Sequence, residues 1–343
     1  MKLLTKLLAT ALLALGLNQA VWADDVSDFR ETLQLAEQGD AKAQNNLGAM
    51  YANGQGVRQD YAEAFRWFRQ AAEQGYAKAQ FNLGLMYDSR YGVRQDYAEA
   101  ARWYRKAAEQ GDAAAQTNLG VMYGNGYGVH QDYAEAVKWY RQAAAQGFAQ
   151  AQVLLGVMYH NGYGVRQDYA EAVKWYRQAA AQGVAQAQYN LGVMYNNGQG
   201  VRQDYAEAVK WYRQAAEQEH AQAQSNLGVM YANGYGMRQD YAEAFRWFRQ
   251  AAEQGYAQAQ NNLGAMYENG RGGRQDYAEA FRWYRKAAEQ GVAEAQYNLG
   301  AMYHNGQGVH QDLHLSKEWF GEACNRGVQE ACNQYRYLNQ KGY

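Results

Sequence analysis

Residues 41–75 read AKAQNNLGAMYANGQGVRQDYAEAFRWFRQAAEQG, and nearly the same stretch returns every 36 residues, eight times in a chain of 343 residues. A tryptophan marks the same point of each copy, from Trp67 to Trp319, and a glycine marks another, from Gly48 to Gly300. A fixed period of this length is typical of a tandem array, in which each repeat buries its apolar surface against its neighbours. We therefore expect one elongated repeat domain instead of several globular ones.

Each copy predicts two helices joined by a tight turn. Strong helix formers fill residues 41–52 without a proline, and Asn53-Gly54-Gln55-Gly56 then supplies residues that accept positive φ. Asp60 precedes Glu63 by three residues, the spacing at which the first side chain caps a new helix while the second reaches back. Gly75 ends this second helix. The predicted fold class is all-α, a solenoid of helix hairpins.

The glycine in the middle of the first helix needs a packing reason. There a glycine costs about 0.5–1 kcal/mol in helix stability relative to alanine. We expect that the missing Cβ at Gly48 lets the rings of Trp67 and Phe68, on the second helix, approach this backbone closely.

The copies share a longer pattern, A-x-A-Q-x-N-L-G-x-M-Y-x-N-G-x-G-V followed by Q-D-Y-A-E-A-x-x-W-Y-R-Q-A-A. This pattern resembles the SEL-one-like repeat (SLR), a relative of the tetratricopeptide repeat. The resemblance implies a right-handed α/α superhelix that presents a concave surface to protein partners. With it we expect an N-terminal capping helix at residues 24–38, eight repeats at 39–326 and a C-terminal capping helix at 327–343.

Residues 1–23 lie outside the array and have the pattern of a secretory signal peptide. Lys2 and Lys6 precede an apolar run over residues 7–17, and Val21-Trp22-Ala23 offers small residues at both cleavage positions. The apolar run is short for a membrane span, and no cysteine follows it to accept a lipid. We expect a soluble mature chain that begins near Asp24, has no stable membrane anchor and is exported to the periplasm or the medium.

Charge and motifs argue against several classes of function. The net charge is −1, and it becomes −3 without the two signal lysines, since 31 basic then face 34 acidic residues. That balance does not favour a nucleic acid or an anionic membrane as partner. No nucleophile motif or phosphate-binding loop is present, and carboxylates such as Glu63 recur at the capping position of the repeats. We expect a monomer that is not an enzyme and needs no cofactor or metal.

The two cysteines, Cys324 and Cys332, stand eight residues apart at the last repeat junction. In a chain that is expected to enter an oxidising compartment, we predict a disulfide between them. Their A-C-x7-C arrangement also resembles the helical cysteine-rich branch of the SLR family, where each repeat carries such a pair. Members of that branch are described as binding or hydrolysing β-lactams. The resemblance therefore implies an alternative function, binding or hydrolysis of β-lactam or peptidoglycan fragments.

Comparison of the repeats with one another indicates where a partner binds. The positions of Lys42, Asn45, Ala49 and Ala52 vary at spacings of three, four and three, so they form one stripe on the first helix. A variable stripe on a constant scaffold predicts a groove for a protein or peptide ligand, with aromatic and apolar members of the Asn45 position as anchors. The predicted partner-binding residues, with two from the Ala52 position, are Phe81, Val153, Tyr189, Tyr297, His160 and Asn196.

Two alternatives remain open for these aromatic residues. The rings of the stripe can instead pack between adjacent first helices or reflect sequence drift. A second series in the turns can line a rim for peptide or glycan, or each ring can simply pack against the next loop; it consists of Tyr91, Tyr127, Tyr163 and Tyr235.

Overall fold

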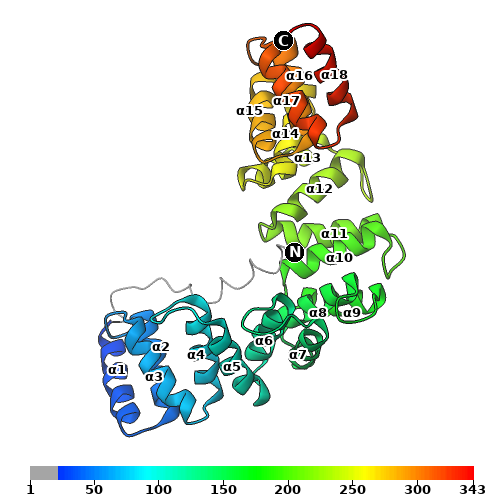
Figure 1. Cartoon of the computed structure of the whole chain (residues 1–343). Coiled ribbons are helices and arrows are strands. Elements are labelled where there is room, and N and C mark those ends of the chain that lie inside the picture. The colour runs from blue at the N-terminus through cyan, green and yellow to red at the C-terminus, as the bar shows by residue number, and fades with distance from the viewer. Residues whose placement is uncertain (1–21) are drawn as a thin grey trace. The chain divides into compact units, whose positions relative to one another are not determined.

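The computed structural model describes residues 22–343, and these residues form a succession of helices (Figure 1). The predicted signal peptide lies outside the described residues, except for its last two positions, which belong to helix α1 (Trp22–Glu37). No helix among residues 22–343 is long and apolar enough to cross a membrane.

Two helices alternate in every repeat, and we name them the A helix and the B helix. The described residues contain eighteen helices and no strand, which confirms the all-α solenoid of helix hairpins. The A helices are α2 (Ala41–Asn53), α4 (Ala77–Ser89), α6 (Ala113–Asn125), α8 (Ala149–Asn161), α10 (Ala185–Asn197), α12 (Ala221–Asn233), α14 (Ala257–Asn269) and α16 (Ala293–Asn305). The B helices are α3 (Tyr61–Glu73), α5 (Tyr97–Glu109), α7 (Tyr133–Ala145), α9 (Tyr169–Ala181), α11 (Tyr205–Glu217), α13 (Tyr241–Glu253), α15 (Tyr277–Glu289) and α17 (Leu313–Asn325), and α18 (Gln329–Gln340) follows.

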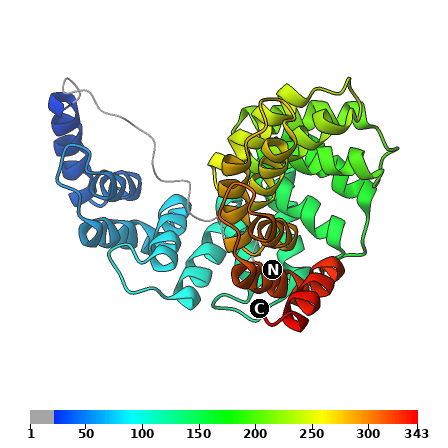
Figure 2. The ribbon, with the colours of Figure 1, turned by 90° about the horizontal axis from the view of Figure 1, so that it is seen from above.

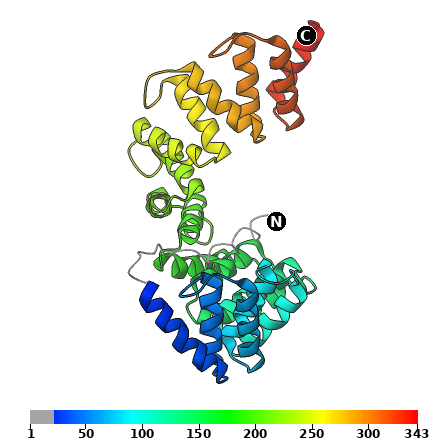
Figure 3. The ribbon, with the colours of Figure 1, turned by 90° about the vertical axis from the view of Figure 1, so that its left-hand side faces the viewer.

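The chain divides into two compact units, one up to Ala179 and one from Ala180 onwards. In the first unit, α1 to α5 follow one another as neighbours in chain order, coloured blue to cyan in Figure 2. In the second unit, Figure 3 shows the same succession from α13 to α18, coloured yellow to red. Each unit is therefore built by stacking hairpins on their neighbours in sequence, as a repeat array requires.

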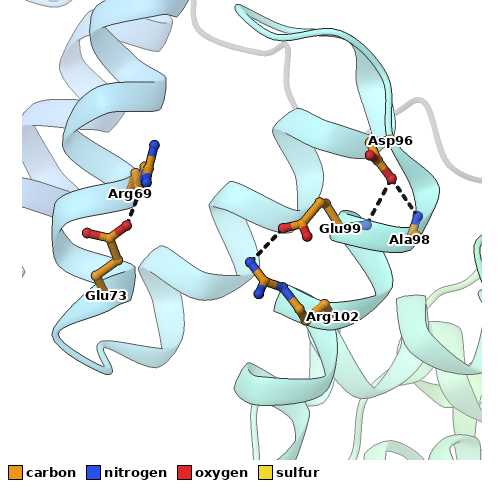
Figure 4. A network of polar contacts seen from close by, with 6 residues as sticks. All are labelled: Arg69, Glu73, Asp96, Ala98, Glu99 and Arg102. Carbon is orange, nitrogen blue, oxygen red and sulfur yellow. Dashed lines mark hydrogen bonds and ion pairs between the residues drawn. The ribbon is translucent and has the colours of Figure 1, made fainter.

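Each repeat's B helix begins after an aspartate. In the second repeat, Asp96 Oδ1 accepts hydrogen bonds from the backbone N–H groups of Ala98 and Glu99, both at 3.0 Å (Figure 4). The Glu99 side chain pairs with Arg102 at 2.7 Å, and the N–H of Asp96 donates to the carbonyl of Tyr87 at 3.0 Å. The predicted capping aspartate is confirmed, but the predicted reach back by the glutamate is wrong. The backbone N–H of Asp96, which the Glu99 side chain was expected to accept, instead donates to the carbonyl of Tyr87 in the A helix.

The glycine in the middle of each A helix lies under a ring of its own B helix. A Cβ built on Gly48 would stand 2.7 Å from Cδ1 of Phe68, far inside van der Waals contact. The predicted close approach is confirmed for Phe68 and wrong for Trp67, which packs with Ala36 of α1 and Leu47 of α2. Because neighbouring side chains on a helix point about 100° apart, the two rings serve different interfaces. Phe68 closes the hairpin, and Trp67 joins it to the preceding helix.

A buried glutamine near the start of each A helix links three helices. Gln80 Nε2 donates to the carbonyl of Ala72 at 3.2 Å, and Gln80 Oε1 accepts from Gln110 Nε2 at 2.7 Å. The same two bonds recur at Gln44, Gln224 and Gln260. In the last repeat Arg326 stands where these partners are glutamine. Among the described residues, Gln296 Oε1 then has no hydrogen-bond partner.

The last two helices are joined covalently. Cys324 of α17 and Cys332 of α18 form a disulfide with their Cα atoms 4.6 Å apart, which confirms the predicted bridge. Next to it, Leu338 of α18 packs into a buried cluster with Phe320 of α17. The bridge and this apolar contact hold α18 on the end of the array, where Figure 1 shows it in red.

Candidate partner-binding surfaces

The A-helix position that starts with Asn45 is a shallow site whose exposure depends on the size of the side chain. Asn45, Thr117 and Ser225 are buried there. Val153 is only 1% exposed, so the prediction that it is an exposed anchor is wrong. A small or branched side chain fits into the space between the helices, and only a larger one extends out of it.

The three aromatic residues at this position are half-buried and rest on B-helix rings. The ring centroids lie 5.8 Å apart for Phe81 and Tyr104, and 6.0 Å apart for Tyr189 and Tyr212. Tyr297 lies 5.5 Å from Phe320 in the same way. The supporting ring is in each case the one that covers the A-helix glycine. One side of each aromatic residue therefore packs on the B helix of its own repeat, and not between adjacent A helices as the alternative expected, while the rest stays accessible.

Around Tyr189 the structure adds a residue that the sequence analysis does not select. The imidazole of His220 stacks on Tyr189 with ring centroids 4.8 Å apart, and its Nδ1 accepts the N–H of Ala223 at 3.3 Å to cap α12. Burial lowers the pKa of His220 and raises the pKa of Tyr189. The signal in the sequence is Glu219, which replaces the usual glycine before this residue and adopts a φ of 61°.

His160 and Asn196 are half-buried and lie two turns along their A helices from Val153 and Tyr189. The edge of the His160 ring meets Tyr169 with centroids 5.2 Å apart, and burial lowers the pKa of this histidine. Asn196 Nδ2 donates to Asn197 Oδ1 at 2.8 Å. Tyr189 and Asn196 thus share one face of α10, whereas His160 stands beside a buried valine.

The tyrosines of the turns form stacked pairs. Each lies flat on the first tyrosine of the preceding B helix, with ring centroids 4.9–5.2 Å apart and planes within 27°. Tyr91, Tyr163 and Tyr235 are exposed, and Tyr127 is half-buried. Each ring therefore packs on one side, but against the preceding B helix and not against the next loop as the alternative expected. The pairs are Tyr61–Tyr91, Tyr97–Tyr127, Tyr133–Tyr163 and Tyr205–Tyr235.

A recurring pocket joins an arginine to the last tyrosine of the next A helix. Arg141 Nη2 donates to the hydroxyl of Tyr159 at 2.8 Å, and the loop with Arg166 closes a pocket of about 570 Å³. Arg213, Tyr231 and their loop form the same arrangement, with about 660 Å³. The sequence analysis does not select these arginines, because the contact depends on how two repeats stack. No group of three potential metal ligands gathers anywhere in residues 22–343.

The family of the chain follows from its repeats. A family model described as Sel1 repeat matches residues 41–76, 77–112, 113–148, 149–184, 185–220, 221–256, 257–292 and 293–328. The chain belongs to the Sel1 repeat family. Sel1 repeat chains are helical scaffolds that generally mediate protein interactions and are generally not catalysts. The matched Sel1 repeats begin at Ala41, the first residue of α2, two positions after the predicted start at Gly39.

Solved structures support the Sel1 assignment. The chain is similar to a protective antigen present in uropathogenic Escherichia coli strains that displays an SLR fold, with 42% identity and a TM-score of 0.83. That match covers 92% of this chain and 68% of the antigen. A Sel1 repeat protein from Oxalobacter formigenes has 32% identity and a TM-score of 0.69, over 97% of this chain and 98% of its own. No curated protein matches the chain.

Proposed function

We propose that this Sel1 repeat chain is an exported scaffold that holds a protein or peptide ligand against its A helices. The observation that supports this most is the setting of Phe81, Tyr189 and Tyr297. Each is half-buried on a ring of its own B helix, so its conformation is fixed before a ligand arrives. A fixed aromatic side chain loses little conformational entropy on binding, which makes it an effective interface anchor.

The rest of the stripe supplies polar contacts next to these anchors. On α10, Asn196 follows Tyr189 on the same face after two turns, and His220 widens the aromatic surface from the side. This combination suits a polypeptide with an apolar side chain next to backbone or polar groups that form hydrogen bonds. Val153 is not part of the proposed surface because it is buried.

Two features support export as part of the proposal. The first 23 residues have the pattern of a signal peptide, and Cys324 and Cys332 are bridged, as is usual for proteins of an oxidising compartment. Mass spectrometry of the protein recovered from the cell envelope or the medium tests this point. An N-terminus near Asp24 supports export, and an intact Met1 in soluble cytosolic protein contradicts it.

Crosslinking capture from intact cell envelopes tests the proposed surface. The variant F81S/Y189S/Y297S removes the anchors, and L35S/Y337S/Y343S is the control, because it removes three exposed apolar side chains outside the A helices. We expect the control and the unmodified protein to capture the same partner and the anchor variant to lose it, with all three unfolding at similar temperatures. Equal capture by both variants would show that the stripe is not the binding surface.

The same protein variants, once purified, distinguish the scaffold from the alternative function of β-lactam binding or hydrolysis. We expect no turnover of a chromogenic β-lactam by the purified protein. Hydrolysis that survives in the anchor variant would instead support the enzymatic alternative.

A further inference from the structure

The last repeat contains a pocket of about 730 Å³ between the end of α15, the start of α16 and the helices α17 and α18. Trp319 and Tyr335 supply its aromatic lining, Cys324 of the disulfide borders it, and Glu318 and Glu322 supply carboxylates. None of the partner-binding residues discussed above lines it. It is a site separate from the A-helix stripe, and the inference below does not depend on the proposed function.

In five of the seven other repeats the equivalent tryptophan carries a cation from its own helix. Lys106 Nζ lies 4.2 Å from the ring centroid of Trp103, and Lys286 Nζ lies at the same distance from Trp283. These lysines stand three residues after the tryptophan. The residue directly before it supplies a cation over Trp67, Trp103, Trp175 and Trp247, at 4.5–5.2 Å for arginine and 5.7 Å for lysine. The ring face of the repeat tryptophan therefore binds a cation at several places in this chain.

At Trp319 both of these positions are acidic. The residue before it is arginine or lysine in the seven other repeats and is Glu318 here, and the residue three after it is Glu322. Within residues 22–343 no side-chain cation lies over the Trp319 ring, and neither glutamate forms an ion pair. Trp319 is half-buried, as are Trp139, Trp175, Trp211 and Trp283, whereas Trp67, Trp103 and Trp247 are buried. A partly accessible indole that carries no cation, next to two carboxylates without an ion pair, is suited to a cation from outside.

The pocket is also lined by a third carboxylate and by two cations. Glu289 is paired with Arg285 at 2.8 Å, and Lys317 Nζ is held by Asn339 Oδ1 at 3.3 Å and by the carbonyl of Tyr343. Arg326 lines the pocket on the side of Gly291, where the absent Cβ leaves room for its guanidinium. These bonds to neutral oxygens leave the charge of Lys317 in place, so Lys317 and Arg326 balance Glu318 and Glu322 over the pocket as a whole, and the preference for a cation is local to the two carboxylates beside Trp319.

We propose that this pocket binds an ammonium or guanidinium cation on the face of Trp319, between Glu318 and Glu322. The cation is carried by a lysine or arginine of a partner polypeptide or by a small amine. It occupies the place that Lys106 and Lys286 occupy over their own tryptophans. One stacked cation with two partly solvated carboxylates gives a dissociation constant on the order of 1 mM at low salt.

Titrations of the full mature chain, labelled with ¹⁵N-tryptophan, test the proposal. The probes are N-acetyl-Gly-Arg-Gly-amide, its lysine and glutamine analogues, and 1,4-diaminobutane, and W319F assigns the indole signal. We expect the cationic probes to shift the Trp319 signal saturably and the glutamine peptide to leave it unchanged. The variant E318Q/E322Q should weaken binding by about fivefold or more, whereas the control E109Q/E217Q, which removes two exposed glutamates elsewhere, should not.

A third variant fills the site from within. E322K restores the lysine that stands at position 286 in the preceding repeat, and we expect it to abolish the shift. Tighter binding of the peptides than of diaminobutane supports a polypeptide source, and the reverse order supports a small amine. Absence of a saturable shift with every cation, or an equal loss in both glutamine variants, would overturn the proposal.

Discussion

The interior repeats and the last hairpin use the same positions in opposite ways. In the interior, Gln80 satisfies both of its amide atoms and Trp103 carries Lys106 over its ring. In the last repeat Gln296 keeps an unpartnered Oε1, and Trp319 stands between two glutamates. The hydrogen bond between two glutamines that the interior repeats form is thus missing in the last repeat. There a disulfide holds the last helix in place.

The difference separates scaffold from function within one chain. A residue that recurs in every repeat is explained by stacking, because every repeat meets the same neighbours. A residue that departs from the repeat, as Glu322 and Arg326 do, is released from that requirement and can serve a ligand. The half-buried rings Phe81, Tyr189 and Tyr297 follow the same logic, since their position varies between repeats while its support is constant.

The largest expected effect contrasts two tryptophans. Trp247→Ala removes a ring that is 6% exposed and packs between two helices of the interior, so we expect a loss of roughly 3–5 kcal/mol in unfolding free energy. Trp319→Ala, in the more accessible last repeat, should cost at least about 1 kcal/mol less. Urea denaturation followed by circular dichroism measures both. Equal losses would mean that the last repeat is packed as tightly as the interior.

Removal of the disulfide comes next. The variant C324S/C332S opens a short loop and should lower the stability of the terminal hairpin by about 2–3 kcal/mol. Hydrogen exchange resolves where this loss falls. We expect faster exchange in α17 and α18 and no change in α2 to α5, and faster exchange throughout the chain would contradict a local staple.

Two glycines of α6 should respond in opposite directions. A Cβ on Gly120 would stand 2.5 Å from Cε1 of Tyr140, so Gly120→Ala should cost roughly 1–3 kcal/mol. Gly124 belongs to the variable stripe, and a Cβ there would meet nothing closer than 3.8 Å. Gly124→Ala should therefore raise stability by roughly 0.5 kcal/mol. Thermal melts of the two variants show whether each substitution raises or lowers stability. If both lower it, the distinction between scaffold and variable positions is wrong.

A smaller effect compares two glutamines. Gln260→Met removes two hydrogen bonds, the one from Gln290 and the one to the carbonyl of Ala252. Gln296→Met removes only the bond to the carbonyl of Ala288, because Gln296 Oε1 has no partner. We expect the interior variant to lose about 1 kcal/mol more stability than the terminal one. If the terminal variant is the less stable of the two, Gln296 has a partner in solution.

The smallest effect concerns pH and the junction at His220. Burial lowers the pKa of His220, so the unfolded chain, with a histidine pKa of about 6.5, takes up the proton first. Stability is therefore full above that pKa and falls as the pH drops below it, by a few tenths of a kcal/mol up to about 1 kcal/mol. His220→Asn keeps a capping side chain and should flatten part of this slope between pH 7.5 and about 5.5. The rest comes from His160, whose pKa burial also lowers. An unchanged slope would show that His220 is solvated.

Local patterns in the sequence were enough for the hairpins but not for their contacts. The capping aspartates and the turn glycines act over a few residues, so their predictions could be made from spacing alone. The choice between Trp67 and Phe68 as the ring over Gly48 could not, because it depends on how the B helix is rotated against the A helix. The burial of Val153 was missed for the same reason.

The sequence by itself determined the helices, their order and the family, because a repeated pattern carries the same local information eight times over. Only the tertiary structure decided which variable side chains are accessible. It also showed that Arg141 meets Tyr159, that His220 stacks on Tyr189 and that Trp319 and Tyr335 line one pocket. These relations join residues from different helices, and their distances depend on the packing between helices, which no single stretch of sequence contains.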